Sequence, residues 1–220
     1  MPGRTLAIGD IHGSHAALAT LLPVISPGPE DTVVILGDIV DRGPGSREAI
    51  DALLELGDRC RVILIQGNHE EMMLNALHGG EWNASWLRYG GEATLASYGG
   101  DPGAIPAEHL DFLRSGCSYF ETDREIFIHA NLEPGIALEK QSAEWLRWTH
   151  ITGFEPAHAS GKRIVCGHTP QRSGVPLNFP GWACIDTLAY GPGWLTCLDV
   201  ETDEFFQTNN AGQYRSSYLR

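Results

Sequence analysis

Residues 32–43 read TVVILGDIVDRG, an apolar run that ends at a glycine and continues as a polar loop. A short run rich in Val and Ile that stops at glycine is typical of a buried strand followed by a loop. The same arrangement occurs in TLAIGDIHG at 5–13, RVILIQGNHE at 61–70 and RIVCGHT at 163–169. Loops at the carboxyl ends of strands form the ligand sites of α/β proteins. These stretches therefore predict polar side chains gathered along one edge of a sheet.

Helix-like runs separate the early strands, and strand-like runs fill the last quarter of the chain. The predicted helices are residues 14–24, 46–56, 70–78, 106–114 and 142–150, with Ser14 and Ser46 as expected N-caps. Further predicted strands are residues 126–129, 183–186, 194–200 and 204–208. Alternation followed by a strand run indicates an α/β protein, a mixed sheet system with helices packed outside it. We expect one domain over residues 1–220.

Charge and hydropathy limit the partners of this chain. The 220 residues carry a formal net charge of −13, which argues against a broad basic surface that binds a nucleic acid backbone. No apolar stretch approaches the roughly 18 residues that a membrane span needs. The first residues run straight into a strand without an apolar signal region, so we expect no signal peptide.

Cysteine usage predicts a reducing compartment. The five Cys residues form no C-x-x-C pair, and four of them fall in or beside apolar runs. Buried, reduced thiols in a cytoplasmic protein are the expected state.

The loops supply the donors for two metal ions. Asp10 and His12 lie two residues apart in an extended stretch, so both side chains point to the same side and can hold one ion. Asp38 can bridge two ions through its two oxygens, and Asn68, His129 and His168 would complete the second ion. Nitrogen and oxygen donors together suit Mn, Fe or Zn better than Ca. Two such ions would activate a water for attack on phosphorus.

Residues beside these donors have the chemistry to complete a phosphoester-cleaving site. His69 follows Asn68 and can protonate the leaving oxygen, while Asp41 can orient it and keep it protonated. Arg42 has a planar fork that matches two phosphate oxygens. Arg147 and Arg163 are candidates for a second phosphate-binding arginine, and Arg147, among aromatic residues, is preferred. Arg42, Arg147 and Asn68 are the candidate substrate-binding residues.

Other polar and aromatic residues have a structural interpretation. Five histidines outside the motifs are expected on the surface: His15, His78, His109, His150 and His158. Asp186 is expected to have a structural role or to support the ligands. Four aromatic residues in one helical region are expected in the core, with a substrate groove as the alternative: Trp82, Trp86, Tyr89 and Tyr98.

The motif set resembles the phosphoprotein phosphatase family within the calcineurin-like metallophosphoesterases, and the small bacterial and phage Ser/Thr phosphatases in particular. The residues that carry this resemblance are GDIHG at 9–13, GDIVDRG at 37–43, GNHE at 67–70, His129, GHT at 167–169, GGEATL at 90–95 and WLR at 145–147. The chain departs from the family at Ala130-Asn131, where a small residue and then glycine are usual, and at Leu188, where glycine is common.

The resemblance implies a sandwich of two mixed β-sheets flanked by helices, with a dinuclear site at the sheet edge. It implies one metal on Asp10, His12 and Asp38, and the other on Asp38, Asn68, His129 and His168. His69 with Asp41 would be the acid pair, and Arg42 with a second arginine would bind phosphate. Manganese is the expected metal, with iron or zinc possible.

Three functions are compatible with these motifs. The first is a phosphomonoesterase that acts on phosphoserine or phosphothreonine in proteins or on a small phosphoester. The second is a symmetrical bis(5'-nucleosyl)-tetraphosphatase, or another metallophosphodiesterase. That sister group typically has Gln in place of His12, so His12 favours the first function. The third is a scaffold without activity, which the presence of His69, Arg42 and every ligand disfavours.

Overall fold

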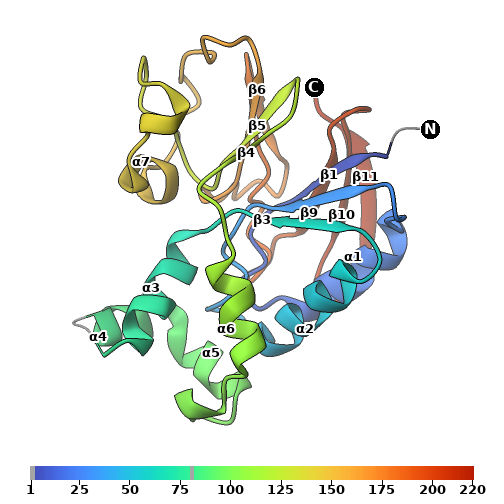
Figure 1. The fold of residues 1–220 in the computed structure, drawn as a ribbon. Helices are drawn as coiled ribbons and strands as arrows, with labels where there is room; N and C mark the ends of the chain where they lie inside the picture. Colours follow the sequence, from blue (N-terminus) through green and yellow to red (C-terminus); the bar gives the residue numbers. More distant parts are fainter. Residues whose placement is uncertain (1–2, 80–81) are drawn as a thin grey trace.

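The computed structural model describes residues 3–79 and 82–220, and within these ranges a pair of β-sheets packs face to face (Figure 1). The first sheet has the strand order β11-β10-β9-β1-β2-β3. Its strands are β1 (Thr5–Ile8), β2 (Thr32–Ile35), β3 (Arg61–Leu64), β9 (Leu195–Asp199), β10 (Glu204–Thr208) and β11 (Tyr214–Tyr218). The second sheet has the order β4-β5-β6-β8-β7. Its strands are β4 (Phe120–Glu121), β5 (Glu125–Phe127), β6 (Arg163–Cys166), β7 (Leu177–Phe179) and β8 (Trp182–Cys184).

Both sheets are mixed, and their parallel regions determine where the loops meet. Strands β1, β2 and β3 are parallel, and β9 runs antiparallel to β1. In the second sheet β5, β6 and β8 are parallel, whereas β4 and β7 pair antiparallel with their neighbours. The carboxyl ends of parallel strands lie at the same edge of a sheet. The loops that carry the predicted ligands therefore leave the sheets together, and the predicted fold class is confirmed.

Helices cover the outer faces of the sandwich (Figure 1). They are α1 (His15–Ile25), α2 (Ser46–Gly57), α3 (Asn68–Leu77), α4 (Trp82–Trp86), a π-helix over Leu87–Gly91, α5 (Glu92–Ser97), α6 (Ala107–Arg114) and α7 (Ala143–Trp148). Short 3₁₀ turns occur at Pro102–Ala104 and Leu138–Lys140. The helices α1 and α2 lie against the first sheet, and α7 lies on the far side beside the second sheet.

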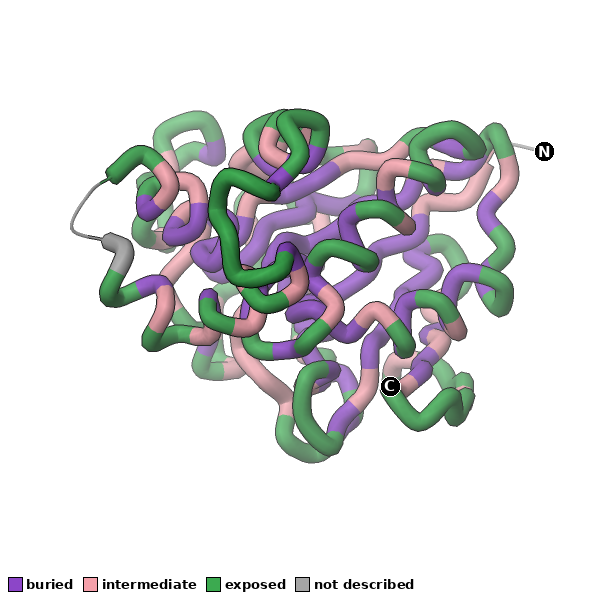
Figure 2. Tube along the Cα trace, turned by 90° about the horizontal axis from the view of Figure 1, so that it is seen from below, coloured by how far each residue is buried: buried purple, intermediate pink, exposed green. Residues whose placement is uncertain are grey.

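Three apolar layers follow from the alternation of side chains along the strands. Leu6 and Ile8 of β1 point to the helices α1 and α2, whereas Ala7 points to the other sheet. The outer face of the second sheet packs its Ile126 and Ile164 against Leu146 of α7. Figure 2 shows these buried segments through the centre of the molecule and exposed loops around them. The layers follow the order helix, sheet, sheet, helix. Packing between these layers keeps the two sheet edges next to each other.

One predicted helix cap and one predicted surface residue are wrong. Ser14 is at the N-cap position of α1, although its side chain makes no capping hydrogen bond, whereas the N-cap of α2 is Gly45 and Ser46 is the first helical residue. The Ser46 hydroxyl instead accepts a hydrogen bond from the Asp41 N–H, at 3.2 Å. His109 is buried, because its ring is held between the Tyr98 hydroxyl and the Asp51 carboxylate. Local sequence does not show these distant partners.

Aromatic residues near the middle of the chain take different places. Trp86 and Tyr98 are buried, as predicted, whereas Tyr89 is exposed. The side chain of Trp82 lies outside the described residues.

All five cysteines are free thiols, and four of them are buried. No helix in the described ranges has the length and hydropathy to cross a bilayer.

One partly buried ion pair at the start of the first sheet gives a test of stability. The Asp31 carboxylate accepts hydrogen bonds from the Arg4 N–H at 2.7 Å, from Arg4 Nη2 at 2.6 Å and from the Gly28 N–H at 3.0 Å. Burial favours the neutral form of Asp31, yet these bonds outweigh it and lower its pKa to about 2. At neutral pH the variant Asp31→Asn should therefore lose about 1–3 kcal/mol of unfolding free energy.

This difference should depend on pH, because the folded pKa lies below the unfolded value. The contribution of Asp31 is complete above about pH 4 and is lost as the pH falls towards 2. Urea unfolding of wild type and variant at several pH values measures it. A difference that stays constant from neutral to strongly acidic pH would contradict the role of this carboxylate.

Candidate metal centre

The loops of the site hold several ordinary residues in the left-handed region of the backbone. His12, Asp38, Asp41, Arg42 and His168 have φ angles of 45°, 48°, 72°, 70° and 61°. Residues other than glycine seldom adopt this conformation, and it costs free energy. Such residues cluster at functional sites, where the surrounding structure fixes them. Their concentration in the predicted motifs marks this edge of the sheets as the site.

Glu70 is the residue that fixes the Asp38 loop, and the sequence analysis gave it no role. It is fully buried, and its carboxylate accepts hydrogen bonds from the backbone N–H groups of Asp38 at 2.8 Å, Ile39 at 2.8 Å and Gly67 at 3.0 Å. These bonds tie the end of β2 to the start of α3. Glu70 lies three residues after the N-cap Gly67, the position from which the Glu of a capping box bonds back to the N-cap N–H, and this spacing is the signal that could have found it.

Close approaches explain two glycines beside the ligands. A Cβ on Gly67 would lie 2.2 Å from Asp38 Oδ1, and one on Gly167 would lie 2.0 Å from Asp10 Oδ1. Both distances are far below van der Waals contact. Glycine at these positions lets the two carboxylates sit directly against the backbone.

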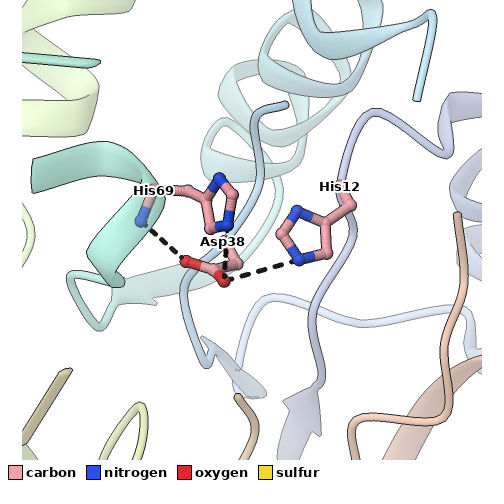
Figure 3. Close-up of side chains that lie close together, drawn as sticks. All are labelled: His12, Asp38 and His69. Carbon is pink, nitrogen blue, oxygen red and sulfur yellow. Dashed lines mark hydrogen bonds and ion pairs between the residues drawn. The ribbon is translucent and has the colours of Figure 1, made fainter. Parts of the chain in front are cut away.

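The carboxylate of Asp38 lies at the centre of the site, with its two oxygens facing different residues. Oδ2 lies 3.4 Å from His12 Nε2 and 4.0 Å from His69 Nε2, as Figure 3 shows. Oδ1 lies 3.4 Å from His129 Nε2 and accepts a hydrogen bond from the His69 backbone N–H at 3.1 Å. One carboxylate therefore serves both halves of the site.

Two groups of metal donors share Asp38. The first consists of His12, Asp38 and His69, and the second of Asp38, His129 and His168. In each group the candidate ligand atoms lie within 4.8 Å of one another. Asn68 Oδ1 adjoins the second group at 3.1 Å from His129 Nε2. Asp10 reaches the site from β1, where its two oxygens accept the His168 N–H, both at 3.1 Å.

In three of these histidines, one ring nitrogen is already hydrogen-bonded to a backbone carbonyl. His12 Nδ1 donates to Val40 O at 2.9 Å, His129 Nδ1 to Leu36 O at 2.7 Å, and His168 Nε2 to Trp148 O at 3.1 Å. This fixes the tautomer and directs the remaining lone pair into the site. Metal-ligating histidines are held in this way in proteins.

Burial keeps these imidazoles neutral. It lowers the pKa values of His12 and His129 and lowers that of His168 to about 3. Burial would raise the pKa of Asp38, yet attraction to the histidines around it, with His69 and its raised pKa among them, outweighs burial and lowers that pKa. Neutral imidazoles and an ionised carboxylate are the protonation states that bind metal.

The remaining buried carboxyl groups are costly to ionise next to one another. Burial, and then the charges of Asp186 and Asp38, raise the pKa of Asp10. Burial also raises the pKa values of Asp186 and of Glu70 to about 7. Several carboxylates in one buried region favour bound cations, which would offset their repulsion. Donor types, tautomers and charge thus all fit a dinuclear metal site.

His69 and Asp41, which the sequence pairs as a candidate proton donor and its partner, lie in contact. His69 Nδ1 lies 2.7 Å from Asp41 Oδ2, and both side chains are buried. Burial lowers the pKa of His69, but the carboxylates of Asp38 and Asp41 outweigh it and raise the pKa above its usual value. Arg42 places Nη1 2.9 Å from His12 Nε2 and Nη2 3.0 Å from His69 Nε2. The guanidinium thus lies across the first donor group.

Arg147 takes a different position from Arg42. Its Nη1 pairs with Glu71 Oε1 at 3.0 Å and its Nη2 donates to Ser118 Oγ at 3.4 Å. Its Nε is the one buried side-chain nitrogen or oxygen of the described residues without a hydrogen-bond partner. The alternative arginine, Arg163, pairs with Asp203 and Glu125 beside the start of β6.

A cavity of about 270 Å³ opens over the donors. Asp38, Asn68, His69 and Arg42 form its polar side. Its other described lining residues are Tyr89, Trp148, His150, Pro170 and Tyr190, together with the ligand His168. Two features of this cavity were not predicted from the sequence. The Tyr190 ring lies 4.7 Å from the Arg42 guanidinium carbon, and His150 stacks on His168 at 4.5 Å. These residues come from separate loops, and no local pattern connects them.

Comparison with known proteins identifies relatives that are similar to part of this chain. A symmetrical bis(5'-nucleosyl)-tetraphosphatase of Nitrosomonas europaea is 32% identical over 139 residues, which cover 62% of this chain and 47% of that protein. A Caenorhabditis elegans protein, named as a candidate serine/threonine-protein phosphatase, is 39% identical over 74 residues, or 33% of this chain and 20% of that protein. The chain thus spans less than half the length of these relatives.

The fold is also found among solved structures. One described as a candidate diadenosine tetraphosphatase has a TM-score of 0.70 and 22% identity, and covers 100% of this chain and 95% of its own. The family model for calcineurin-like phosphoesterases matches residues 3–179, a range that contains every ligand loop described above. The chain therefore belongs to the calcineurin-like phosphoesterase family.

Proposed function

We propose that this protein is a metal-dependent phosphoesterase that cleaves a dinucleoside polyphosphate symmetrically. The cavity carries this proposal, because aromatic rings of Tyr89, Trp148 and Tyr190 surround the polar floor of Asp38, His69 and Arg42. Aromatic rings stack on nucleobases of any sequence, while the cationic and metal-binding floor suits a phosphate chain. The similarity to the tetraphosphatase of Nitrosomonas europaea over 62% of the chain supports the same substrate class.

A Ser/Thr protein phosphatase is the second candidate. His12, where the sister group typically has Gln, favours it. The similarity to the C. elegans protein, over one third of the chain, is a further argument. The acidic composition makes a nucleic acid substrate the least favoured of the phosphodiester alternatives.

The proposed chemistry divides between the metals and the side chains. Bound divalent ions, for which we propose manganese with iron or zinc as alternatives, would polarise the phosphoryl oxygens and acidify a water. Asp10, His12, Asp38, Asn68, His129 and His168 would hold them. Arg42 orients the phosphoryl group through its planar fork. His69, oriented by Asp41 and kept protonated by its raised pKa, gives its proton to the leaving oxygen.

Arg147 is proposed as the second phosphate-binding residue. Its buried Nε–H lacks a partner among the described residues, and an unsatisfied buried donor is costly. A phosphate oxygen would satisfy that donor. Its pairing with Glu71 would hold the guanidinium in place while the substrate binds.

The shared position of Asp38 predicts the result of Asp38→Asn. An amide has one acceptor oxygen and no charge, so the variant should bind less metal in both donor groups. Metal analysis of protein purified with manganese should give two ions per wild-type chain and a loss at both positions in the variant. Asp111→Asn, at an exposed position of α6, is the control. Two ions retained by Asp38→Asn would refute the bridging role.

The His69 ring lies in the first donor group, so it could act as a metal ligand as well as a proton donor. Replacing His69 distinguishes these two roles. His69→Asn should keep both ions and lower kcat by about 10²–10⁴-fold, the usual contribution of a general acid. His78→Asn changes an exposed histidine just after the same helix and should change neither quantity. Loss of one ion from His69→Asn would make His69 a ligand, and full activity would remove it from the reaction.

A substrate panel tests the proposed substrate class. Manganese-loaded protein should hydrolyse diadenosine tetraphosphate with a higher kcat/KM than a phosphoserine peptide or p-nitrophenyl phosphate. Symmetrical cleavage yields ADP alone, so chromatography of the products checks the bond that is broken. Preference for the phosphopeptide would favour the second candidate, and formation of ATP with AMP would contradict symmetrical cleavage.

A further inference from the structure

We propose that Trp86 and Thr94 are positioning residues for the proton donor, because they fix Asp41, which in turn fixes His69. This inference rests on the proposed role of His69 in phosphoester hydrolysis. Trp86 ends α4 and Thr94 lies in α5, so both come from helices outside the ligand loops. Neither Trp86 nor Thr94 is among the residues that line the cavity over the metal donors. They act on the reaction only through Asp41.

Both oxygens of the Asp41 carboxylate are occupied by donors from this region. Trp86 Nε1 donates to Oδ1 at 2.9 Å and to Oδ2 at 3.0 Å. The Thr94 hydroxyl donates to Oδ1 at 2.7 Å. Oδ2 is thereby turned to His69 Nδ1, 2.7 Å away. Two donors hold the carboxylate through three contacts and fix its rotation, so the imidazole keeps one orientation.

The same threonine also holds the backbone of Asp41. The Asp41 N–H donates to the Thr94 hydroxyl at 2.8 Å, and Ser46 Oγ lies 3.1 Å from that hydroxyl. Asp41 has a φ of 72°, a left-handed conformation that needs such support in a residue other than glycine. Asp41 and Thr94 have no exposed surface, and Trp86 is 1% exposed. Water therefore does not compete for these hydrogen bonds.

The chain between Trp86 and Thr94 also supports this arrangement around Asp41. A Cβ on Gly91 would lie 2.5 Å from the Trp86 ring, so glycine allows the indole to pack directly against the backbone. The Gly90 carbonyl accepts the Arg42 N–H at 3.1 Å. Residues 86–94 therefore support the partner of the proton donor and the backbone of the phosphate-binding arginine together.

Trp86 also belongs to the hydrophobic core, so its loss could act through stability alone. The two roles differ in their dependence on the leaving group. A proton donor matters most when the leaving oxygen is basic and little when it is a stable anion. Loss of folded protein lowers the rate on every substrate by the same factor. The ratio of rates on two aryl phosphates therefore distinguishes positioning from packing.

The experiment uses metal-loaded Trp86→Phe and Thr94→Val, which keep most of the side-chain volume and remove the donor. The substrates are phenyl phosphate, with a basic leaving group, and 2,4-dinitrophenyl phosphate, with a weakly basic one. We expect kcat to fall about ten-fold on the first substrate and less than about two-fold on the second, a fraction of the loss caused by removing the acid itself. KM and metal content should stay unchanged.

Matched controls are available elsewhere in the core. Trp182 is buried and its indole N–H donates to Pro156 O at 3.0 Å, so Trp182→Phe loses an equivalent hydrogen bond. Thr208 is buried and donates to Ala17 O at 2.7 Å, so Thr208→Val matches Thr94→Val. Both controls should leave the ratio of the two rates unchanged.

His69→Asn separates failure of this inference from failure of the proposed function. If His69→Asn is sensitive to the leaving group and the Trp86 and Thr94 variants are not, the positioning role is overturned and the acid role stands. If His69→Asn is also insensitive, His69 is not the proton donor, and both proposals fail.

A second measurement does not depend on turnover. In zinc-loaded, ¹⁵N-labelled protein, the Trp86 indole signal is the one missing from Trp86→Phe. Asp41→Asn should move it strongly, because the indole N–H then loses a charged acceptor, and should leave the Trp182 signal in place. An unchanged Trp86 signal would show that the indole does not bind Asp41 and would overturn the inference.

Discussion

A buried carboxylate shared between two sets of imidazoles is the constraint on which this molecule depends. Asp38 sits at the end of β2, and its oxygens point in two directions, to His12 and to His129. The loop can present it this way only with a left-handed backbone, which Glu70 stabilises by accepting hydrogen bonds from three N–H groups of this region. The interaction is electrostatic, and the supporting hydrogen bonds are what make its geometry specific.

The two-sheet architecture follows from that requirement. His12 and Asp38 come from the first sheet, whereas His129 and His168 follow strands of the second. Neither sheet alone provides both donor groups. The apolar layer between the sheets, with Ala7, Val34 and Val165 among its members, holds the two edges at a fixed separation. Core packing therefore determines the geometry of the metal centre, because a shift between the sheets would separate the donors.

The candidate metal donors could be found in the sequence because most of them follow a strand with an obvious pattern. The strand at Thr5–Ile8 and the loop after it are local features, and parallel pairing brings such loops together without further information. The partners of Asp41 could not be predicted in this way. Trp86 is 45 residues away in the chain, and its indole reaches the carboxylate only because helices pack around it. The same reason explains Ser46, whose hydroxyl has a tertiary partner where a local cap was expected.

The glycines beside the ligands have a consequence for how this protein can diversify. At Gly67 and Gly167 the carboxylate oxygens occupy the space where any side chain would begin. No other amino acid can replace glycine at these two positions as long as the metals are needed. Tyr89, His150 and Tyr190, in contrast, are exposed at the rim and free of that restriction. Adaptation to new phosphorylated substrates should therefore change the residues at the rim, while the residues at the floor of the cavity stay the same in related proteins.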